Sequence, residues 1–261
     1  MTPRSFPLLS DKHSGEAVVT PENFVAYINR RKNTSPAVVP ECLILCYQKS
    51  LLWQIAQTMN ITDAYLSTQP IMMLDDFDAK VAVAGDFGIG APAAVAVFEN
   101  MVASGVKKIV SVGTAGSLQP DLKVGDMVVC DRAIRDEGTS FHYLPPEKYS
   151  SADPELTTLL AASLKRHNTP FRVGTTWTTD APYRETKAEV LHYQQEGVLC
   201  VDMEASALFA VARCRNVKTA SLFVVSDSLA NLSWVPGFHF KSVRSSLMAL
   251  IGTAATTLTE L

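Results

Sequence analysis

The Met-Glu pair Met203-Glu204 is the most informative place in the chain for chemistry. Residues 197–201 before it have the composition of a short buried strand, and Ala205 to Cys214 after it have that of a helix. In open α/β sheets ligands bind at the carboxyl ends of strands, where a glutamate can accept hydrogen bonds from two adjacent hydroxyl groups. We expect Glu204 to bind a sugar diol such as that of ribose, with Met203 packed on the apolar face of the sugar. The alternative is that Glu204 only stabilises the start of the helix.

A second carboxylate, Asp227, follows Ser226 at the end of the strand expected over 220–226. Breaking an N-glycosidic bond builds positive charge on the sugar and negative charge on the departing base. A site for this reaction needs a carboxylate near the sugar and an acid near the base, and Glu204 and Asp227 are candidates for these two tasks. The alternative for Asp227 is an N-cap or turn residue before Ser228.

Two loops before expected helices add further candidates. The glycines in residues 87–90, Gly88 among them, let backbone N–H groups approach a ligand at a helix start. Asp86 beside them is either a carboxylate that holds a water molecule or an ordinary acid in a surface turn. In the loop over 180–185, Arg184 is a candidate for contact with a base oxygen or a phosphate group.

The charge balance excludes several classes of partner. The formal net charge is -3, and Arg30-Arg31-Lys32 is the one basic run, so nucleic acid is not expected to bind. No apolar stretch approaches the roughly 18 residues that span a bilayer, and the N-terminus lacks the apolar core of a signal peptide. We therefore expect a soluble, cytoplasmic protein that does not contact a membrane.

The histidines and cysteines form no pattern typical of a metal site or a disulfide framework. The five histidines are scattered without paired spacing, and the five cysteines are an odd number without a Cys-x-x-Cys motif. We assign no metal and expect reduced cysteines, most of them in the core.

Apolar segments rich in valine and isoleucine alternate along the chain with longer amphipathic ones. The expected strands are 42–47, 81–85, 108–112, 127–132, 171–176, 199–201 and 220–226. The expected helices are 21–31, 50–59, 91–104, 154–167, 185–196, 205–213 and 241–258. This alternation predicts an α/β protein with a mostly parallel sheet covered by helices.

The domain organisation expected from the sequence is simple. An N-terminal extension with one helix, residues 1–39, precedes one α/β domain over residues 40–261, because no linker divides the remaining chain. An apolar fraction of 47% with 19% charged residues suits a sheet covered on both faces or a surface buried between subunits. We therefore expect a homo-oligomer.

Four motifs, in the right order, resemble those of the purine nucleoside phosphorylase and uridine phosphorylase superfamily, which includes the methylthioadenosine nucleosidases. They are Phe87-Gly88-Ile89-Gly90, Gly113-Thr114-Ala115-Gly116 followed by Val124-Gly125-Asp126, Val201-Asp202-Met203-Glu204, and Val224-Val225-Ser226-Asp227. The resemblance covers about residues 40 to 260. It implies a single α/β domain with a central mixed, partly barrel-like sheet surrounded by helices, assembled as a dimer, trimer or hexamer.

The resemblance also implies an enzyme that cleaves the bond between ribose and a nucleobase without a metal or an organic cofactor, with phosphate possible as a co-substrate. By resemblance, Thr114 lines the sugar and acceptor pocket, Met203 and Glu204 hold the ribose, and Tyr183 or its neighbours in the loop over 180–185 stack on the base. The Ser226-Asp227 pair resembles that of the purine-acting branch, in which the aspartate protonates or hydrogen-bonds N7 of the departing base. A small-molecule nucleoside, with a purine base, is the expected substrate.

The chain departs from the family pattern where phosphate is bound. Phosphorolytic members use an arginine in a loop after the first strand, another before the Gly-Thr turn, and a third from a neighbouring subunit. Here Leu51 and Ser111 stand at the first two places, and residues 68–73 contain no arginine. Burying a phosphate dianion without such donors is costly, although Lys49 is a candidate substitute.

The hydrolytic members use a glutamate in the first loop to activate water, which Leu51 cannot do. Three functions follow from the sequence. The first, which we favour, is a purine nucleosidase that uses water. The second is a phosphorylase with a rearranged anion site, and the third is a non-catalytic protein that binds a nucleoside or base.

Overall fold

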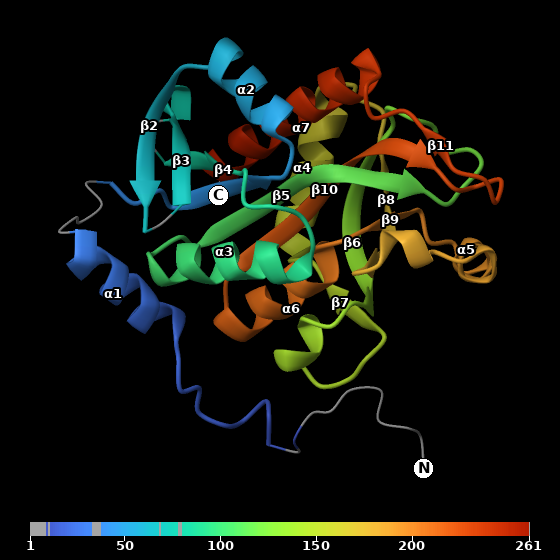
Figure 1. The fold of residues 1–261 in the computed structure, drawn as a ribbon. Helices are drawn as coiled ribbons and strands as arrows, with labels where there is room; N and C mark the ends of the chain where they lie inside the picture. Colours follow the sequence, from blue (N-terminus) through green and yellow to red (C-terminus); the bar gives the residue numbers. More distant parts are fainter. Residues whose placement is uncertain (1–8, 10, 33–37, 68, 78–79, 261) are drawn as a thin grey trace.

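Two short strands, β1 (Cys42–Cys46) and β4 (Val81–Ala84), are buried at every position and show how the sheet is built. The structure is a computed structural model that describes residues 9, 11–32, 38–67, 69–77 and 80–260 (Figure 1). Uninterrupted apolar strands are typical of parallel pairs covered on both faces, and β1 pairs in parallel with both β4 and β5 (Lys108–Ser117). Helices therefore have to cover both sides of this part of the sheet.

Five strands close into a ring. β5 pairs with β10 (Lys218–Ser228), β10 with β6 (Met127–Asp136), β6 with β8 (Arg172–Thr179), β8 with β9 (Cys200–Asp202), and β9 returns to β5. Three of these pairs, β5–β10, β6–β8 and β8–β9, are parallel, and the other two are antiparallel. This ring confirms the mixed, partly barrel-like sheet, whereas the mostly parallel sheet expected from the alternation holds for only part of it.

The sheet continues beyond β1 as an antiparallel extension that the sequence did not predict. β3 (Gln69–Leu74) pairs with β4, and β2 (Ile61–Leu66) pairs with β3. Two short strands, β7 (Tyr149–Ser151) and β11 (Val235–Pro236), add to β6 and β10. β2 is mostly exposed or half-buried and β3 contains Pro70, so neither has the apolar pattern of the inner strands.

The α-helices of the described residues lie close to the ranges expected from the sequence. They are α1 (Pro21–Lys32), α2 (Lys49–Thr58), α3 (Ala91–Ala103), α4 (Pro154–Arg166), α5 (Lys187–Gln195), α6 (Ala205–Arg215) and α7 (Lys241–Thr259). α3 packs against α6, and α7 packs against α2 and α4 (Figure 1). Within β1, Leu43 and Leu45 pack into the cluster with α3, whereas Ile44 packs into the cluster with α7, as the alternation of a strand requires.

The N-terminal helix α1 lies against α3 (Figure 1). The boundary at residue 39 between an extension and the main domain stays a prediction, and residues 1–8, 10 and 33–37 of that extension lie outside the described residues. The expected free cysteines are confirmed, because Cys42, Cys46, Cys130 and Cys200 are buried and Cys214 is exposed, all without a disulfide. Within the described ranges, none of the helices is long and apolar enough to cross a membrane.

Candidate active site

A cavity of about 740 Å³ lies where β5, β9 and β10 end, which is where open α/β sheets bind ligands. Its size suits a small-molecule ligand. Its lining comes from the ends of these strands, from the loop after β1, from the segment 182–190 and from the segment 229–238. The polar and charged lining residues are Tyr47, Gln48, Thr114, Tyr183, Glu185, Lys187, Asp202, Glu204, Ser226, Asp227, Ser233 and Trp234.

Glu204 stands between β9 and α6 and is only 8% exposed. Its carboxylate does not cap α6, and its Oε1 accepts a hydrogen bond of 2.6 Å from the backbone N–H of Gly90 instead. Burial and, second, the nearby Asp202 raise the pKa of Glu204 to about 8. The geometry thus disfavours the simple role at a helix start and places a carboxyl group of variable charge in the wall of the cavity, next to Met203.

Asp202, rather than Glu204, organises the turn from β9 to α6. Its Oδ1 accepts hydrogen bonds from the Thr176 and Thr178 hydroxyls at 3.0 and 2.8 Å. Its Oδ2 accepts from the backbone N–H groups of Glu204 and Ala205 at 2.9 and 2.7 Å. Burial raises the pKa of Asp202, although these four donors act in the opposite direction. Asp202 therefore holds Glu204 in position.

Asp227 lies near the end of β10, and a register shift between Val225 and Asp227 interrupts the pairing with β5. The Ser226 hydroxyl donates to Asp227 Oδ1 at 2.7 Å, and the Trp234 indole Nε1–H donates to Oδ2 at 2.9 Å. A bulge re-aims side chains, and Asp227 lines the cavity although it is only 8% exposed. No α-helix follows until α7, so Asp227 is not a helix N-cap.

Gly116 has no side chain and so leaves the space that the carboxyl group of Asp227 occupies. A Cβ atom at Gly116 would lie 3.2 Å from Asp227 Oδ2 and 2.7 Å from Leu229 Cδ1. At Gly113 a Cβ would lie 3.1 Å from the ring of Tyr47. The two glycines of the Gly-Thr-Ala-Gly motif thus let the cavity walls approach β5 closely.

Tyr47, Gln48 and Thr114 form the wall near the end of β1. The Gln48 Nε2 group donates to Thr114 Oγ1 at 3.0 Å, and the Tyr47 hydroxyl lies 2.8 Å from Ser111 Oγ. Gln48 Oε1 is buried and has no hydrogen-bond partner among the described residues, a situation that typically costs about 1–3 kcal/mol. Leu51, at the place of a family arginine, is buried in the core. Neutral residues, Leu51 and Ser111, thus stand at both places where this chain would carry a phosphate-binding arginine.

The loop after β8 brings a group that the sequence reasoning did not single out. Glu185 lines the cavity, and burial followed by the charge of Asp227 raises the pKa of Glu185 to about 7. Tyr183 lines it too and is 99% exposed, so its ring is accessible to a ligand. Among the residues that the structure describes, Lys187 is the one cationic residue in the lining, against the carboxyl groups of Asp202, Glu204, Asp227 and Glu185.

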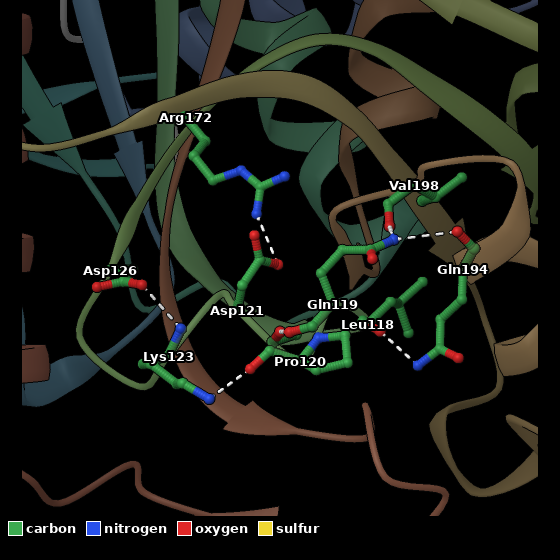
Figure 2. Close-up of polar contacts among 10 residues, drawn as sticks. Leu118, Gln119, Pro120, Asp121, Lys123, Asp126, Arg172, Gln194 and Val198 are labelled. Carbon is green, nitrogen blue, oxygen red and sulfur yellow. Dashed lines mark hydrogen bonds and ion pairs between the residues drawn. The ribbon is translucent and has the colours of Figure 1, made fainter.

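Glutamine side chains tie α5 to the ends of β5 and β10. Gln194 Nε2 donates to the carbonyl groups of Leu118 and Ala230 at 2.6 and 2.7 Å. In return, Gln119 Nε2 donates to the carbonyl groups of Gln194 and Val198 at 3.3 and 2.7 Å (Figure 2). α5 supplies Val190 to the cavity, so these bonds fix one of its walls.

The structure brings together six of the residues expected from the sequence, since all of them line the cavity: Thr114, Tyr183, Met203, Glu204, Ser226 and Asp227. Asp86, Gly88 and Arg184 do not line it. Asp86 is 53% exposed in its side chain and forms an ion pair of 3.0 Å with Lys49, which is 79% exposed. Neither charge of this pair belongs to the cavity lining.

Gln48 and Glu185 are the residues that sequence reasoning missed. Each is a polar residue in a loop between a strand and a helix, which was the available signal. In the described parts of the chain no cluster of three His, Cys, Asp or Glu side chains has the arrangement of a metal site.

Comparison with known proteins gives related enzymes. The chain is 33% identical over 142 residues to the guanosine phosphorylase of Halorubrum lacusprofundi, covering 54% of this chain and 59% of that protein. It is 27% identical over 157 residues to the uridine phosphorylase of Escherichia coli, covering 55% and 62%. It is 30% identical over 152 residues to the DeoD-type purine nucleoside phosphorylase of Shewanella denitrificans, covering 58% and 64%. The matches thus span about three fifths of these relatives.

The fold and the family agree. The crystal structure of uridine phosphorylase from Vibrio fischeri matches with a TM-score of 0.73 and 22% identity, covering 85% of this chain and 93% of that chain, which establishes a shared fold. The family model described as the phosphorylase superfamily matches residues 74–254, a segment that contains all four motifs of the cavity and its strands. The chain therefore belongs to the phosphorylase superfamily.

Proposed function

We propose that this protein cleaves the N-glycosidic bond of a purine nucleoside and transfers the ribose to water. The observation that carries the proposal is one cavity in which Glu204 and Asp227 are buried carboxyl groups that Asp202 and Ser226 hold in place, and whose lining, among the residues that the structure describes, contains no arginine. The carboxyl groups supply both tasks that bond cleavage requires, and the lack of arginine disfavours phosphate.

Glu204 acts on the sugar. The Gly90 N–H donates to Oε1 and fixes the orientation of the carboxylate, which accepts hydrogen bonds from the hydroxyl groups of ribose. In the ionised form, Glu204 stabilises the positive charge that develops on the sugar as the bond to the base breaks. Met203, which also lines the cavity, supplies the apolar contact beneath the sugar.

Asp227 acts on the base. Ser226 and Trp234 each donate to one of its oxygens, and these two bonds keep the carboxyl group in the cavity wall. From there it binds or protonates the nitrogen that gains negative charge when the base leaves. Tyr183 stacks on the base, whereas Arg184, in the same loop, does not line the cavity and has no role in this proposal.

The purine preference rests on the Ser226-Asp227 pair, which resembles that of purine-acting relatives. Two of the similar proteins are a guanosine phosphorylase and a purine nucleoside phosphorylase, although others are uridine phosphorylases. We carry the purine base over to this chain as part of the proposal. The reaction needs neither a metal nor an organic cofactor.

Phosphate as the acceptor is the second candidate. It is favoured by the names of the similar proteins, all phosphorylases in the three comparisons above, and by Lys187 in the cavity lining. A single lysine among four carboxyl groups gives a dianion poor compensation for the loss of its hydration. A protein that binds a nucleoside without cleaving it is the third candidate, and the two carboxyl groups speak against it.

The test is to incubate the protein with adenosine, inosine, guanosine, methylthioadenosine and uridine, each with and without phosphate, and to identify the sugar product by chromatography. We expect free ribose from the purine nucleosides, independent of phosphate. Ribose 1-phosphate formed only with phosphate would replace our proposal by the phosphorylase, and tight binding without products would support the binding protein.

The Asp227→Asn variant tests the role of the acid. We expect a loss of turnover of about 100-fold or more, which is typical when an acid–base group is removed. Asp63→Asn, at an exposed position of β2, is the matched control and should retain full turnover. Unchanged turnover in Asp227→Asn would exclude this role.

The assembly also remains a proposal. We propose a homo-oligomer, because large apolar side chains such as Trp53 and Phe240 are 68% and 56% exposed in the single chain. Sedimentation at several concentrations measures the subunit number.

A further inference from the structure

Gln48 has a side-chain orientation that its place in the fold does not require. It stands at the N-cap of α2 in an extended conformation, yet its side chain makes no hydrogen bond to the helix. The Nε2 group of Gln48, which follows β1, instead donates to Thr114 Oγ1 on β5 at 3.0 Å. The side chain is therefore directed to the cavity that both residues line.

The remaining atom of this amide, Oε1, is an acceptor with a fixed position. It is buried and has no hydrogen-bond partner among the described residues. With Nε2 donating to Thr114, Oε1 is the atom of the amide that is left to accept a hydrogen bond. Such an acceptor binds a group that donates a hydrogen bond, such as water, and repels the unprotonated oxygens of a phosphate dianion.

The charges around Gln48 point in the same direction. Neighbouring Lys49 is paired with Asp86 at 3.0 Å and is 79% exposed, so its ammonium group does not compensate an anion in the cavity. Ser111, at the place of a family arginine, interacts with the Tyr47 hydroxyl at 2.8 Å. The wall formed by Tyr47, Gln48 and Thr114 is thus uncharged and polar, which suits a neutral acceptor.

We infer that Gln48 is the positioning residue for the water molecule that attacks C1′ of the sugar, an inference that rests on the proposed hydrolytic function. The water oxygen forms a bond to C1′ while the C1′–N bond breaks and its electron pair leaves with the base. Gln48 Oε1 accepts a hydrogen bond from the water and does not remove the proton. The water then loses one proton to solvent, and the base takes up one proton, so the products are ribose and the neutral base.

Gln48, rather than Asp86, therefore holds the attacking water molecule. Asp86 lies outside the cavity lining and its carboxylate is paired with Lys49, whereas Gln48 contacts Thr114 directly. The two assignments predict different sensitive positions, so mutation separates them.

The experiment compares Gln48→Leu, which removes the acceptor at similar volume, with Gln48→Glu, which keeps an acceptor oxygen. Gln57→Ala, an exposed glutamine of the same helix α2, is the matched control. Hydrolysis of inosine or of the fastest purine nucleoside is followed without phosphate over a range of pH. Thermal unfolding shows whether each variant is folded.

For Gln48→Leu we expect a fall in kcat of about 10- to 100-fold, with KM within about threefold of the wild type, as for a lost positioning contact. Gln48→Glu should recover part of the rate, and the ratio of its rate to that of the wild type should rise with pH as the new carboxyl group ionises. A purely structural role of Gln48 would lower stability without this new pH dependence.

Three results would overturn the inference. They are a kcat for Gln48→Leu within twofold of the wild type, a rise in KM alone, or a large loss in Asp86→Asn but not in Gln48→Leu. If Gln48→Leu does not fold, a ratio of the Gln48→Glu rate to the wild-type rate that does not rise with pH has the same meaning. If the wild type releases ribose without phosphate and the kcat of Gln48→Leu is unchanged, only the role of Gln48 is overturned. A wild type that requires phosphate overturns the proposed hydrolysis as well.

Discussion

At Glu204 the needs of folding and of the proposed reaction conflict. Burial and the neighbouring Asp202 raise the pKa of Glu204 to about 8, so the folded protein favours the neutral carboxyl group at neutral pH. Stabilisation of a cationic sugar requires the ionised form. We therefore expect kcat/KM to rise with pH up to about pH 8 as Glu204 ionises in the free protein.

The same pKa predicts how stability depends on pH. Between the usual glutamate pKa of 4.5 and the folded value of about 8, the unfolded chain binds fewer protons than the folded chain, so stability falls as pH rises. Glu204→Gln removes this ionisation and keeps an oxygen for the Gly90 N–H. We expect similar stability of variant and wild type near pH 5, but a variant more stable by roughly 1–4 kcal/mol above pH 8, and inactive.

Calorimetric unfolding of both proteins at the two pH values measures this difference, with the exposed Glu16→Gln as a control that should change little. A stability difference that is equal at both pH values would show that Glu204 does not titrate in this range. Glu185, whose pKa is raised to about 7, titrates in both proteins and cancels in the comparison.

Residue types predicted the groups proposed for the sugar and the base better than the group proposed to hold the attacking water. Met203, Glu204 and Asp227 follow strand-like segments at helix starts or strand ends, so local sequence was enough to expect them in one place. Gln48 lies in a loop whose neighbours along the chain carry no sign of its contact with Thr114. Which loops meet is decided by strand pairing far away in sequence, and this limits what a local pattern can predict.

Among the secondary-structure elements, the ring from β5 to β10 determines the geometry of the cavity. Sequence predicted the first half of β5 and most of β10, but β5 continues to Ser117 through Gly113 and Gly116. Glycines weaken a strand when only local propensity is considered. In the ring, β10 and β9 pair with this part of β5 and supply the hydrogen bonds that local propensity does not predict. The antiparallel strands β2 and β3 were not predicted, because β2 is mostly exposed or half-buried and β3 contains Pro70.

The tight contact between β5 and β10 can be tested at Gly116. In Gly116→Ala the new Cβ would lie 2.7 Å from Leu229 Cδ1 and 3.2 Å from Asp227 Oδ2, so something must shift. We expect a loss of stability of about 1–3 kcal/mol and a fall in turnover, because Asp227 is displaced. Urea unfolding and a turnover assay measure the two effects.

Gly252→Ala in α7 is the matched control for this substitution. A Cβ at Gly252 meets nothing within 4 Å, so alanine should stabilise the helix by about 0.5–1 kcal/mol without affecting turnover. If both alanine variants have the same stability and turnover as the wild type, β5 and β10 are not as tightly packed as described.

On the scale of the whole molecule, charge disfavours anionic ligands. The chain has a formal net charge of -3, and the cavity lining adds four carboxyl groups against one lysine. Like charges in a partly buried cavity oppose the entry of a phosphorylated substrate. The molecule should therefore select nucleosides over nucleotides even where the bases are identical.

Inosine and its 5′-monophosphate provide the test of this selection. We expect kcat/KM to be at least about 10-fold higher for inosine at low ionic strength, and the ratio to narrow in high salt because the repulsion is screened. Measuring both substrates at two salt concentrations gives the result. Equal kcat/KM values, or a ratio that salt does not change, would contradict an electrostatic origin.

The position of β1 outside the five-strand ring has a consequence for how this family can diversify. The groups proposed for the sugar and the base, Glu204 and Asp227, stand on ring strands or directly after them, whereas Tyr47 and Gln48 follow β1, which pairs with β4 and with β5 and is not part of the ring. In the proposed reaction Tyr47 and Gln48 form part of the wall that meets the acceptor, so substitutions in the loop after β1 can change how the acceptor is bound while Glu204 and Asp227 stay in place.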